Sequence, residues 1–366
     1  HLSGTGIGDL FDVTLMPVIG EVKYARGTED DPTSGLWSYA DRTQEVTRPG
    51  YYSVPLKRYG IKAEMTATSR VGFHRYTFPA SEEAAIVIDL QNGGCWDKTT
   101  EASFNRVSDT RTEGYRYSKG WANDQKVYFV ADFSKPMADC TITEDGMYAR
   151  VAFSTAKDEQ IYVKVALSPV SIEGAKANMA AELPDWNFER TIEAADKAWN
   201  TELAKMRITT TNEAAKRVFY TALYHALLHP NILSDVNGEY PAMESNKTLR
   251  TSSGERYTVF SLWDTYRNLH QLLTLVYPEK QCDMIRSMVA MSEEWGWLPR
   301  WELYGRETYT MEGDPAIPVI VDSYLKGIRD FDIEAAYRAM LRSATTEGKS
   351  NPIRPDIDPY IELGYI

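Results

Sequence analysis

At 366 residues, the chain is long enough for two domains, or for one large domain, each with a sizeable apolar core. Its net charge of -12 argues against electrostatic binding to nucleic acid or to an anionic membrane, and no apolar stretch approaches the roughly 18–20 residues that a membrane span needs. The 23 Tyr and 9 Trp suit carbohydrate binding, but they equally suit a protein rich in β-strands.

The first 170 or so residues favour β-strands. β-branched and aromatic runs alternate with turn signals such as RPG (48–50) and EDG (144–146). Antiparallel strands at this spacing predict a β-sandwich over residues 1–183. The runs cover residues 51–56, 61–78, 84–90, 126–133, 147–154 and 161–168.

Beyond about residue 185, the apolar residues recur with a helical period. Residues 188–206 place Phe188, Ile192, Ala195 and Trp199 on one stripe, so a connecting helix is predicted within a linker at 184–208. The remainder, 209–366, predicts stacked helical hairpins, in which loops at one rim converge on a central pocket. The helical runs are 214–229, 261–276, 279–295, 315–328 and 332–344.

The sequence WDTYR (263–267) begins one of these helices and combines aromatic, acidic and basic side chains. Asp264 and Arg267 are three residues apart and share a helix face, so one interpretation is an ion pair at a helix end. The other is a polyol site. There the carboxylate accepts from adjacent hydroxyls, the guanidinium donates, and Trp263 offers a flat apolar face.

A second cluster lies at 293–314, EEWGWLPRWELYGRETYTMEGD, a predicted loop with many aromatic residues. Trp301, Glu302, Glu307 and Asp314 are its candidate site residues. Glycoside hydrolysis needs a pair of carboxyl groups, and carboxylates among aromatic rings could provide it. For each of these carboxylates taken singly, a solvated surface group is the default interpretation.

The glycine-rich start, HLSGTGIGDL (1–10), lacks the GK[ST] and the βαβ pattern of a nucleotide-binding loop. It is either a simple tight turn or a turn that brings His1, Ser3 and backbone amides toward a ligand. His225 and His229 are four residues apart but lack the glutamate of HExxH, which favours core or interface positions over a metal site.

Long motifs, spread in order through essentially the whole chain, resemble the glycoside hydrolase family 92 α-mannosidases. The resemblance implies an N-terminal β-sandwich (supersandwich-like) packed on an (α/α)6 barrel. It also implies calcium-dependent, inverting hydrolysis of terminal α-mannosides on glycans, commonly by bacterial enzymes of the periplasm or cell surface. The motifs are HLSGTG (1–6), RPGYYSV (48–54), TATSRVGFHRYTFP (66–79), FYTALYHALLHPNILSDVNGEY (219–240), YTVFSLWDTYR (257–267), LPRWELYGRET (298–308) and VIVDSYLKGIRDFD (319–332).

The resemblance also implies roles for individual residues. Asp264 and Arg267 would hold hydroxyls of the terminal mannose beside Trp263. The family's HxSGTG loop, which reaches into the active site, falls on residues that include His1, Ser3 and Gly4, and its WEL…ET motif places Trp301, Glu302 and Glu307 in the pocket lining. Asp314 belongs to GDPA (313–316), where the family has GDHA, which leaves the linkage specificity open.

Other family motifs are missing. The general acid, general base and calcium site of the family lie near EGN, GND and GNE motifs, none of which occurs here. Family members carry about twelve barrel helices, whereas five or six are predicted after the linker. We therefore expect the chain to be part of a longer protein, with the catalytic acid and base and most calcium ligands beyond Ile366, and only the first part of the barrel in 209–366.

Two alternatives remain open. The first is a non-catalytic carbohydrate-binding protein of the same fold, which the missing catalytic motifs favour if the 366 residues are read alone. The second is another (α/α)-barrel carbohydrate-active enzyme, such as a phosphorylase or a lyase. The expected partner in each case is a glycan rather than a nucleic acid, and the sequence leaves the oligomeric state open.

Overall fold

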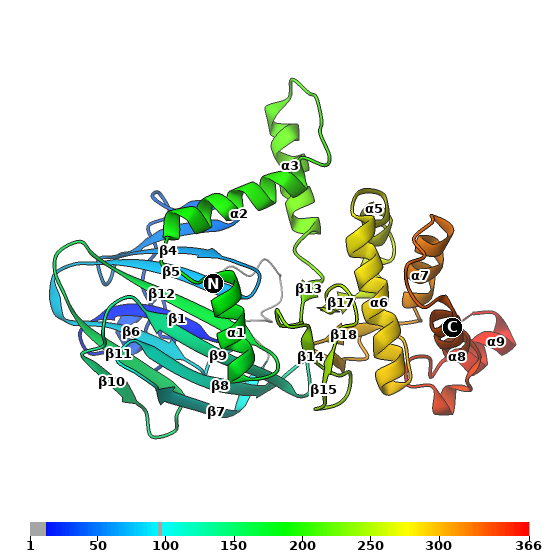
Figure 1. Ribbon diagram of the computed structural model, residues 1–366, viewed down its shortest axis with the longest axis horizontal. Coiled ribbons are helices and arrows are strands. Elements are labelled where there is room, and N and C mark those ends of the chain that lie inside the picture. Colours follow the sequence, from blue (N-terminus) through cyan, green and yellow to red (C-terminus); the bar gives the residue numbers. More distant parts are fainter. Residues whose placement is uncertain (1–11, 94–96, 366) are drawn as a thin grey trace. The chain divides into compact units, whose positions relative to one another are not determined.

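The structure, a computed structural model, describes residues 12–93 and 97–365 and divides the chain into two compact units (Figure 1). Unit 1 runs to Gly120 and resumes at Asp124–Ala204, and unit 2 comprises Trp121–Asn123 and the chain from Lys205 onward. The chain therefore has a β-rich N-terminal part followed by a helical part. None of the helices in the described residues combines the length and apolar character needed to cross a membrane.

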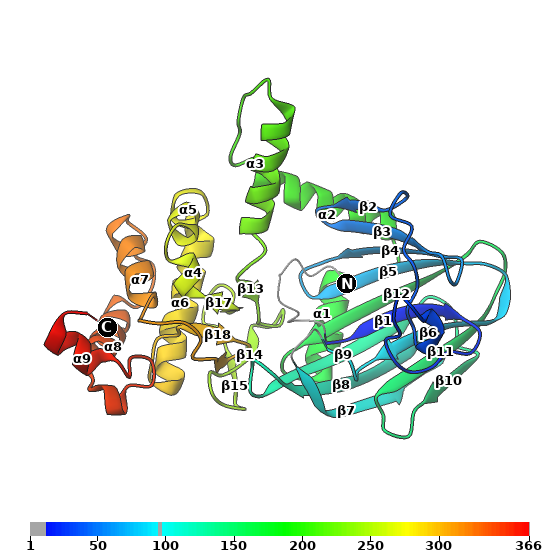
Figure 2. The same cartoon turned by 180° about the vertical axis from the view of Figure 1, so that it is seen from behind.

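Unit 1 contains two antiparallel sheets that share one apolar core (Figures 1 and 2). The four-stranded sheet has the order β1-β6-β11-β10, and the eight-stranded sheet has the order β2-β3-β4-β5-β12-β9-β8-β7. The strands are β1 Thr14–Ile19, β2 Val46–Arg48, β3 Tyr51–Leu56, β4 Ile61–Ala67, β5 Val71–Phe78, β6 Ser81–Asp89, β7 Lys98–Arg106, β8 Arg111–Lys119, β9 Gln125–Phe133, β10 Asp139–Ile142, β11 Tyr148–Thr155 and β12 Glu159–Ser168.

The predicted strands are present, with one correction. The run 61–78 is not one strand but the hairpin β4–β5, closed by a hydrogen bond of 2.9 Å from Thr68 N to the Val71 carbonyl. β6 lies between β1 and β11, and its residues 84–88 are all fully buried. This explains why 84–88 reads as a continuous apolar run rather than as an alternating one.

The other face of the eight-stranded sheet is covered by two helices, α1 (Ile172–Glu182) and α2 (Phe188–Leu203). α1 was not predicted. The Ser171 hydroxyl caps it by accepting from Gly174 N at 3.0 Å. α2, the predicted connecting helix, begins on Phe188, which is fully buried against Phe73 with ring centroids 5.0 Å apart. It packs on β3 and β4 and belongs to unit 1.

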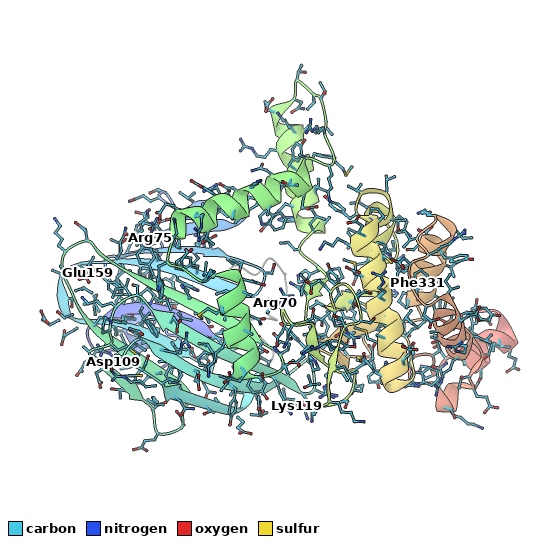
Figure 3. All side chains as sticks on the ribbon, in the orientation of Figure 1. Arg70, Arg75, Asp109, Lys119, Glu159 and Phe331 are labelled. Atoms are coloured by element: carbon cyan, nitrogen blue, oxygen red, sulfur yellow. The ribbon has the colours of Figure 1, made fainter. Side chains whose placement is uncertain are left out.

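Charged contacts also hold α2 to the sheet. Arg75 of β5, labelled near the start of α2 in Figure 3, pairs with Glu189, and Arg48 of β2 pairs with Asp196. Close packing completes the contact. Gly50 has a φ of 79°, and a Cβ added there would lie 2.7 Å from Ala195 Cβ.

Gly50→Ala is therefore expected to lower the free energy of unfolding by more than about 1–2 kcal/mol, the cost of a left-handed backbone conformation in a non-glycine residue. Gly60→Ala is the matched control, because Gly60 has a φ of 63° but open space around its added Cβ. Chemical denaturation of both variants measures the difference. Equal losses in the two variants would show that the contact with Ala195 relaxes without cost.

Unit 2 is mainly helical, with three small sheets. α6 lies among α5, α7 and α8, and these helices share an apolar core that includes the fully buried Ile285 and Met288. The elements are α3 Glu213–Ala226, β13 Asn231–Ile232, β14 Glu239–Pro241, β15 Thr248–Arg250, β16 Tyr257–Thr258, β17 Phe260–Ser261, α4 Leu262–Thr265, α5 Leu269–Val276, α6 Pro278–Trp295, β18 Trp301–Leu303, β19 Arg306–Glu307, α7 Ala316–Leu325, α8 Ile333–Thr345 and α9 Ile357–Leu363.

The predicted helix 261–276 is wrong in one respect, because it is two helices. α4 ends at Thr265, and α5 begins only at Leu269, after Asn268 with φ of -154°. This extended φ lies outside the helical range, so the chain changes direction between the two helices. The break leaves the WDTYR residues on a single helical turn and the bend that follows it.

Candidate functional site

The WDTYR residues are placed by the short strand β17 and by α4. Leu262 is fully buried in the core of unit 2, which fixes the start of α4, and Asp264 two residues later is exposed. The Ser261 hydroxyl donates to Asp264 Oδ2 and so orients the carboxylate. The other carboxylate oxygen remains able to accept hydrogen bonds from a ligand.

Arg267 does not pair with Asp264. Its guanidinium carbon lies 4.2 Å from the ring centroid of Trp263 and 5.0 Å from that of Tyr266, and no ion pair joins Arg267 to Asp264. The interpretation of the two residues as an ion pair at a helix end is therefore wrong. Instead, Asp264 is exposed on α4, and the exposed guanidinium of Arg267, just after α4, lies over two aromatic rings, so the polyol site stays a prediction.

Trp301 lies on β18, which pairs with β17 directly before α4. Its ring packs on Trp121, with centroids 4.6 Å apart and an interplanar angle of 32°. Trp121 Nε1 donates to Thr310 Oγ1 at 3.1 Å. Trp301 is 4% exposed, so it acts in this structure mainly as a packing residue beneath the loop that follows it.

Glu302, the next residue, is fully buried. Its Oε1 accepts from Thr258 Oγ1 at 2.8 Å and from Gly305 N at 2.5 Å, and its Oε2 accepts from Val259 N at 3.0 Å. Burial outweighs these hydrogen bonds and raises the pKa of Glu302 to about 7. The carboxyl group thus joins β16–β17 to the turn after β18.

Glu307 lies opposite Glu302 in the β18–β19 pair and is also buried. Its carboxylate accepts from three backbone amides, Arg300 N at 2.8 Å, Trp301 N at 3.0 Å and Tyr309 N at 3.0 Å. Burial raises the pKa of Glu307 as well. The structure therefore shows Glu302 and Glu307 holding the backbone, and their contribution to the pocket lining stays a prediction.

These carboxylates stabilise an unusual backbone. Non-glycine residues with positive φ are uncommon, and such conformations cluster at functional sites. Three residues with positive φ lie at hydrogen bonds to these carboxylates. Glu302 accepts from the backbone amide of Val259 and from that of Gly305, which follows Tyr304, and Glu307 accepts from the amide of Tyr309. The φ values are 50° at Glu244, 64° at Val259, 56° at Tyr304, 56° at Tyr309 and 65° at Met311.

Asp314 lies just before α7. Its Oδ1 accepts from Arg354 Nη1 at 3.2 Å, which links the start of α7 to the segment before α9. Asp314 keeps part of its side chain exposed, at 22%. The structure does not bring Asp314 into hydrogen-bond contact with Asp264, so its place in the binding site stays a prediction.

Two further predictions concern residues or groups that the structure does not place in a site. His1, Ser3 and Gly4 lie outside the described residues. Within residues 12–93 and 97–365, no group of three or more His, Cys, Asp and Glu side chains could hold a metal ion. The described side chains therefore do not fit a complete calcium site, which needs six to eight oxygen ligands.

Several residues of this region carried no signal in the sequence. Arg300 donates to the carbonyls of Ile353 at 2.7 Å and Tyr309 at 2.5 Å. Glu244 Oε1 accepts from Glu307 N at 2.7 Å, although 63 residues separate them. The contacts of Arg300 with Ile353 and of Glu244 with Glu307 join residues that are 53 and 63 positions apart, so neither periodicity nor spacing could have indicated them.

Comparison with known proteins assigns the chain to a family. Residues 1–168 match the Glycosyl hydrolase family 92 N-terminal domain, and residues 174–366 match the Glycosyl hydrolase family 92 catalytic domain. The chain belongs to glycosyl hydrolase family 92. The junction of the two matches at 168–174 falls between β12 and the first turn of α1, inside unit 1 of this family 92 chain.

Solved structures of family 92 proteins are also similar to this chain. The family GH92 α-mannosidase BT3965 from Bacteroides thetaiotaomicron is 36% identical with a TM-score of 0.91, over 95% of this chain and 49% of that one. The structure of its complex with mannoimidazole is 35% identical with a TM-score of 0.94, over 100% of this chain and 50% of that one. The inverting mannosidase BT2199 from the same organism is 25% identical with a TM-score of 0.84, over 97% of this chain and 48% of that one.

This family 92 chain therefore spans about half the length of the solved structures it matches. The comparison with curated proteins gave no match.

Proposed function

We propose that this chain forms part of an exo-α-mannosidase that removes terminal non-reducing mannose from glycans with inversion. The observation that carries the proposal is the exposed pair Asp264 and Arg267 in a chain of family 92, beside the rings of Trp263 and Tyr266. A sugar ring has hydroxyl edges and an apolar C–H face, and these side chains complement both. The mannoimidazole complex of BT3965, a similar protein, supports a mannose ligand.

The roles follow from chemistry. Asp264 accepts from sugar hydroxyls, and Arg267, held on its two rings, donates to them. Inverting hydrolysis further needs an acid and a base roughly 6.5–9.5 Å apart, with a water between the base and the sugar. Glu302 and Glu307 are buried and accept hydrogen bonds from backbone amides, so we place the catalytic acid and base outside these 366 residues.

We propose that unit 2 is the first part of an (α/α)6 barrel. Large apolar side chains are exposed on its helices: Leu275 at 80%, Leu325 at 73%, Tyr337 at 57% and Ile361 at 66%. Exposed apolar surfaces of this kind mark interaction sites, and further barrel helices would cover them. Calcium, which would polarise sugar oxygens as a hard Lewis acid, would take most ligands from outside the described residues.

The test is release of mannose from α-linked mannosides by the full-length protein, before and after calcium chelation, for wild type and Asp264→Asn. Loss of a charged hydrogen bond to the sugar costs about 1.5–3 kcal/mol, so kcat/KM should fall about ten- to hundredfold. Asp322→Asn is the control, because Asp322 lies on α7 and pairs with Lys326.

Mannoside binding without release would instead favour a non-catalytic carbohydrate-binding protein of the same fold. Release that Asp264→Asn leaves unchanged would remove Asp264 from the site. We also propose that the protein acts in the periplasm or at the cell surface of a bacterium, where extracellular glycans are accessible. Cell fractionation with an antibody to the chain tests this location.

A further inference from the structure

A second candidate site lies in unit 2, apart from Asp264. It is an open pocket of about 530 Å³, a size typical of small-molecule sites. Asp264, Arg267 and Trp263 do not line it. Its walls are the segment after β15, the second half of α6 and the segment before α8, where Phe331 is labelled beside α6 in Figure 3.

Specific contacts fix these walls. Gly254 has a φ of 66°, and an added Cβ would lie 2.2 Å from Asp283 Oδ1, so the segment after β15 approaches α6 closely. Arg286 of α6 donates to Asp283 at 2.8 Å and to Asp330 at 2.6 Å. The second bond joins α6 to the segment before α8, so the pocket walls are held in place without a ligand.

The innermost charged residue of the pocket is Arg256, which is 1% exposed. Its two terminal nitrogens each donate to Glu294 at 2.9 Å, and its guanidinium carbon lies 4.5 Å from the ring centroid of Tyr240. Among the described residues, Arg256 Nε has no hydrogen-bond acceptor. A buried donor without an acceptor is unfavourable, so a ligand oxygen that reached this donor would be stabilised.

The charge of the lining indicates the ligand class. Four arginines, Arg250, Arg256, Arg286 and Arg329, face four carboxylates, Glu255, Glu293, Asp330 and Asp332, so the lining has no net charge. A phosphate or sulfate group would require an excess of positive charge. Alternating donors and acceptors with the hydroxyls of Ser252 and Ser253 and the aromatic Phe331 instead match a neutral ligand rich in hydroxyl groups.

We propose that this pocket is a second carbohydrate site, which binds one or two neutral hexose units without cleaving them. Glu293, exposed on α6, accepts from sugar hydroxyls, and the exposed hydroxyls of Ser252 and Ser253 donate to sugar oxygens. Such a site would keep a glycan bound to the protein while the terminal sugar of that glycan lies outside this pocket. The inference does not require that the protein hydrolyses mannosides.

The experiment is calorimetric titration of the purified full-length protein with methyl α-D-mannopyranoside and, separately, with inorganic phosphate. We expect the sugar to bind and phosphate not to bind. Glu293→Gln removes the acceptor charge and should weaken sugar binding about tenfold or more, and Ser253→Trp should abolish it by filling the pocket. Glu279→Gln is the matched control on α6, because Glu279 is exposed in the first turn and does not line the pocket.

Asp264→Asn separates the two sites. If sugar binding persists in Asp264→Asn and is lost in Glu293→Gln and Ser253→Trp, the second site is supported. Binding that only Asp264→Asn removes, phosphate binding that Glu293→Gln strengthens, or no binding of either probe would overturn it. Failure of the proposed hydrolysis would show differently, as absence of mannose release with binding at this pocket intact.

Discussion

Replacing Arg256 with methionine is expected to lower the free energy of unfolding by about 3–5 kcal/mol, the cost of removing one partner from a buried ion pair. Arg256 and Glu294 are 1% and 6% exposed at their side chains and form two parallel hydrogen bonds of 2.9 Å. Tyr240 Oη and Met243 N also donate to Glu294, at 2.9 and 2.7 Å. These two neutral donors would remain, but the buried negative charge would lose its counter-charge.

Chemical denaturation followed by tryptophan fluorescence measures this loss. Arg250→Met is the matched control, since Arg250 pairs with Glu239 at 3.0 Å but is 61% exposed, and exposed pairs contribute only about 0–1 kcal/mol. The double variant Arg256→Met/Glu294→Met should recover part of the loss, because it leaves no unpaired buried charge. A loss in Arg256→Met no larger than in Arg250→Met would contradict the prediction.

The second large effect concerns Glu302 and pH. The pKa of Glu302 is about 7 in the folded protein against an ordinary value of 4.5, so the folded state binds this proton more tightly than the unfolded state. The contribution of Glu302 to stability is therefore greatest below about pH 4.5 and falls as the pH rises to about 7. With about 1.4 kcal/mol per pKa unit, the fall amounts to about 3 kcal/mol.

Glu302→Gln cannot titrate, so the difference in unfolding free energy between wild type and Glu302→Gln should change by about 3 kcal/mol between about pH 4.5 and pH 7.5. Denaturation curves for both proteins across this range measure it. Repeating them at high salt is the control, because salt screens a buried group much less than surface charges. Parallel stability–pH curves for the two proteins would show that Glu302 titrates alike in the folded and unfolded states.

Local patterns predicted most elements of the fold. The alternation and turn signals before residue 170 indicated β3, β6, β9, β11 and β12, and the helical period indicated α2, α3, α6, α7 and α8. β7 was missed because Phe104 is its one buried residue, and β8 was missed because the residues that it buries are Thr112, Gly114, Arg116 and Ser118, which carry no apolar signal. α1 was missed because its burial falls on small residues such as Gly174 and Ala175, which carry little hydrophobic signal.

The candidate site was predicted less completely. The sequence indicated Asp264 and Arg267 as a pair on one helix face; in the structure both are exposed, but only Asp264 lies on α4, and Arg267 follows the end of that helix. It could not distinguish an ion pair from ring stacking, because Arg267 lies three residues after Asp264 and four after Trp263, and both spacings allow contact on a helix. The side-chain direction was decided by the end of α4 at Thr265, which moves Arg267 onto Trp263 and Tyr266.

The sequence by itself determined that a strand-rich part is followed by a helical part, and it determined the membership of glycosyl hydrolase family 92, because periodicity and long motifs are local properties of the chain. Only the tertiary structure decided which charged groups are buried and what they bind. Glu302 reaches Thr258 across 44 residues, and Arg256 reaches Glu294 across 38. The free energy of a buried charge depends on its desolvation and its partners, and both are set by contacts between segments that are distant in the sequence.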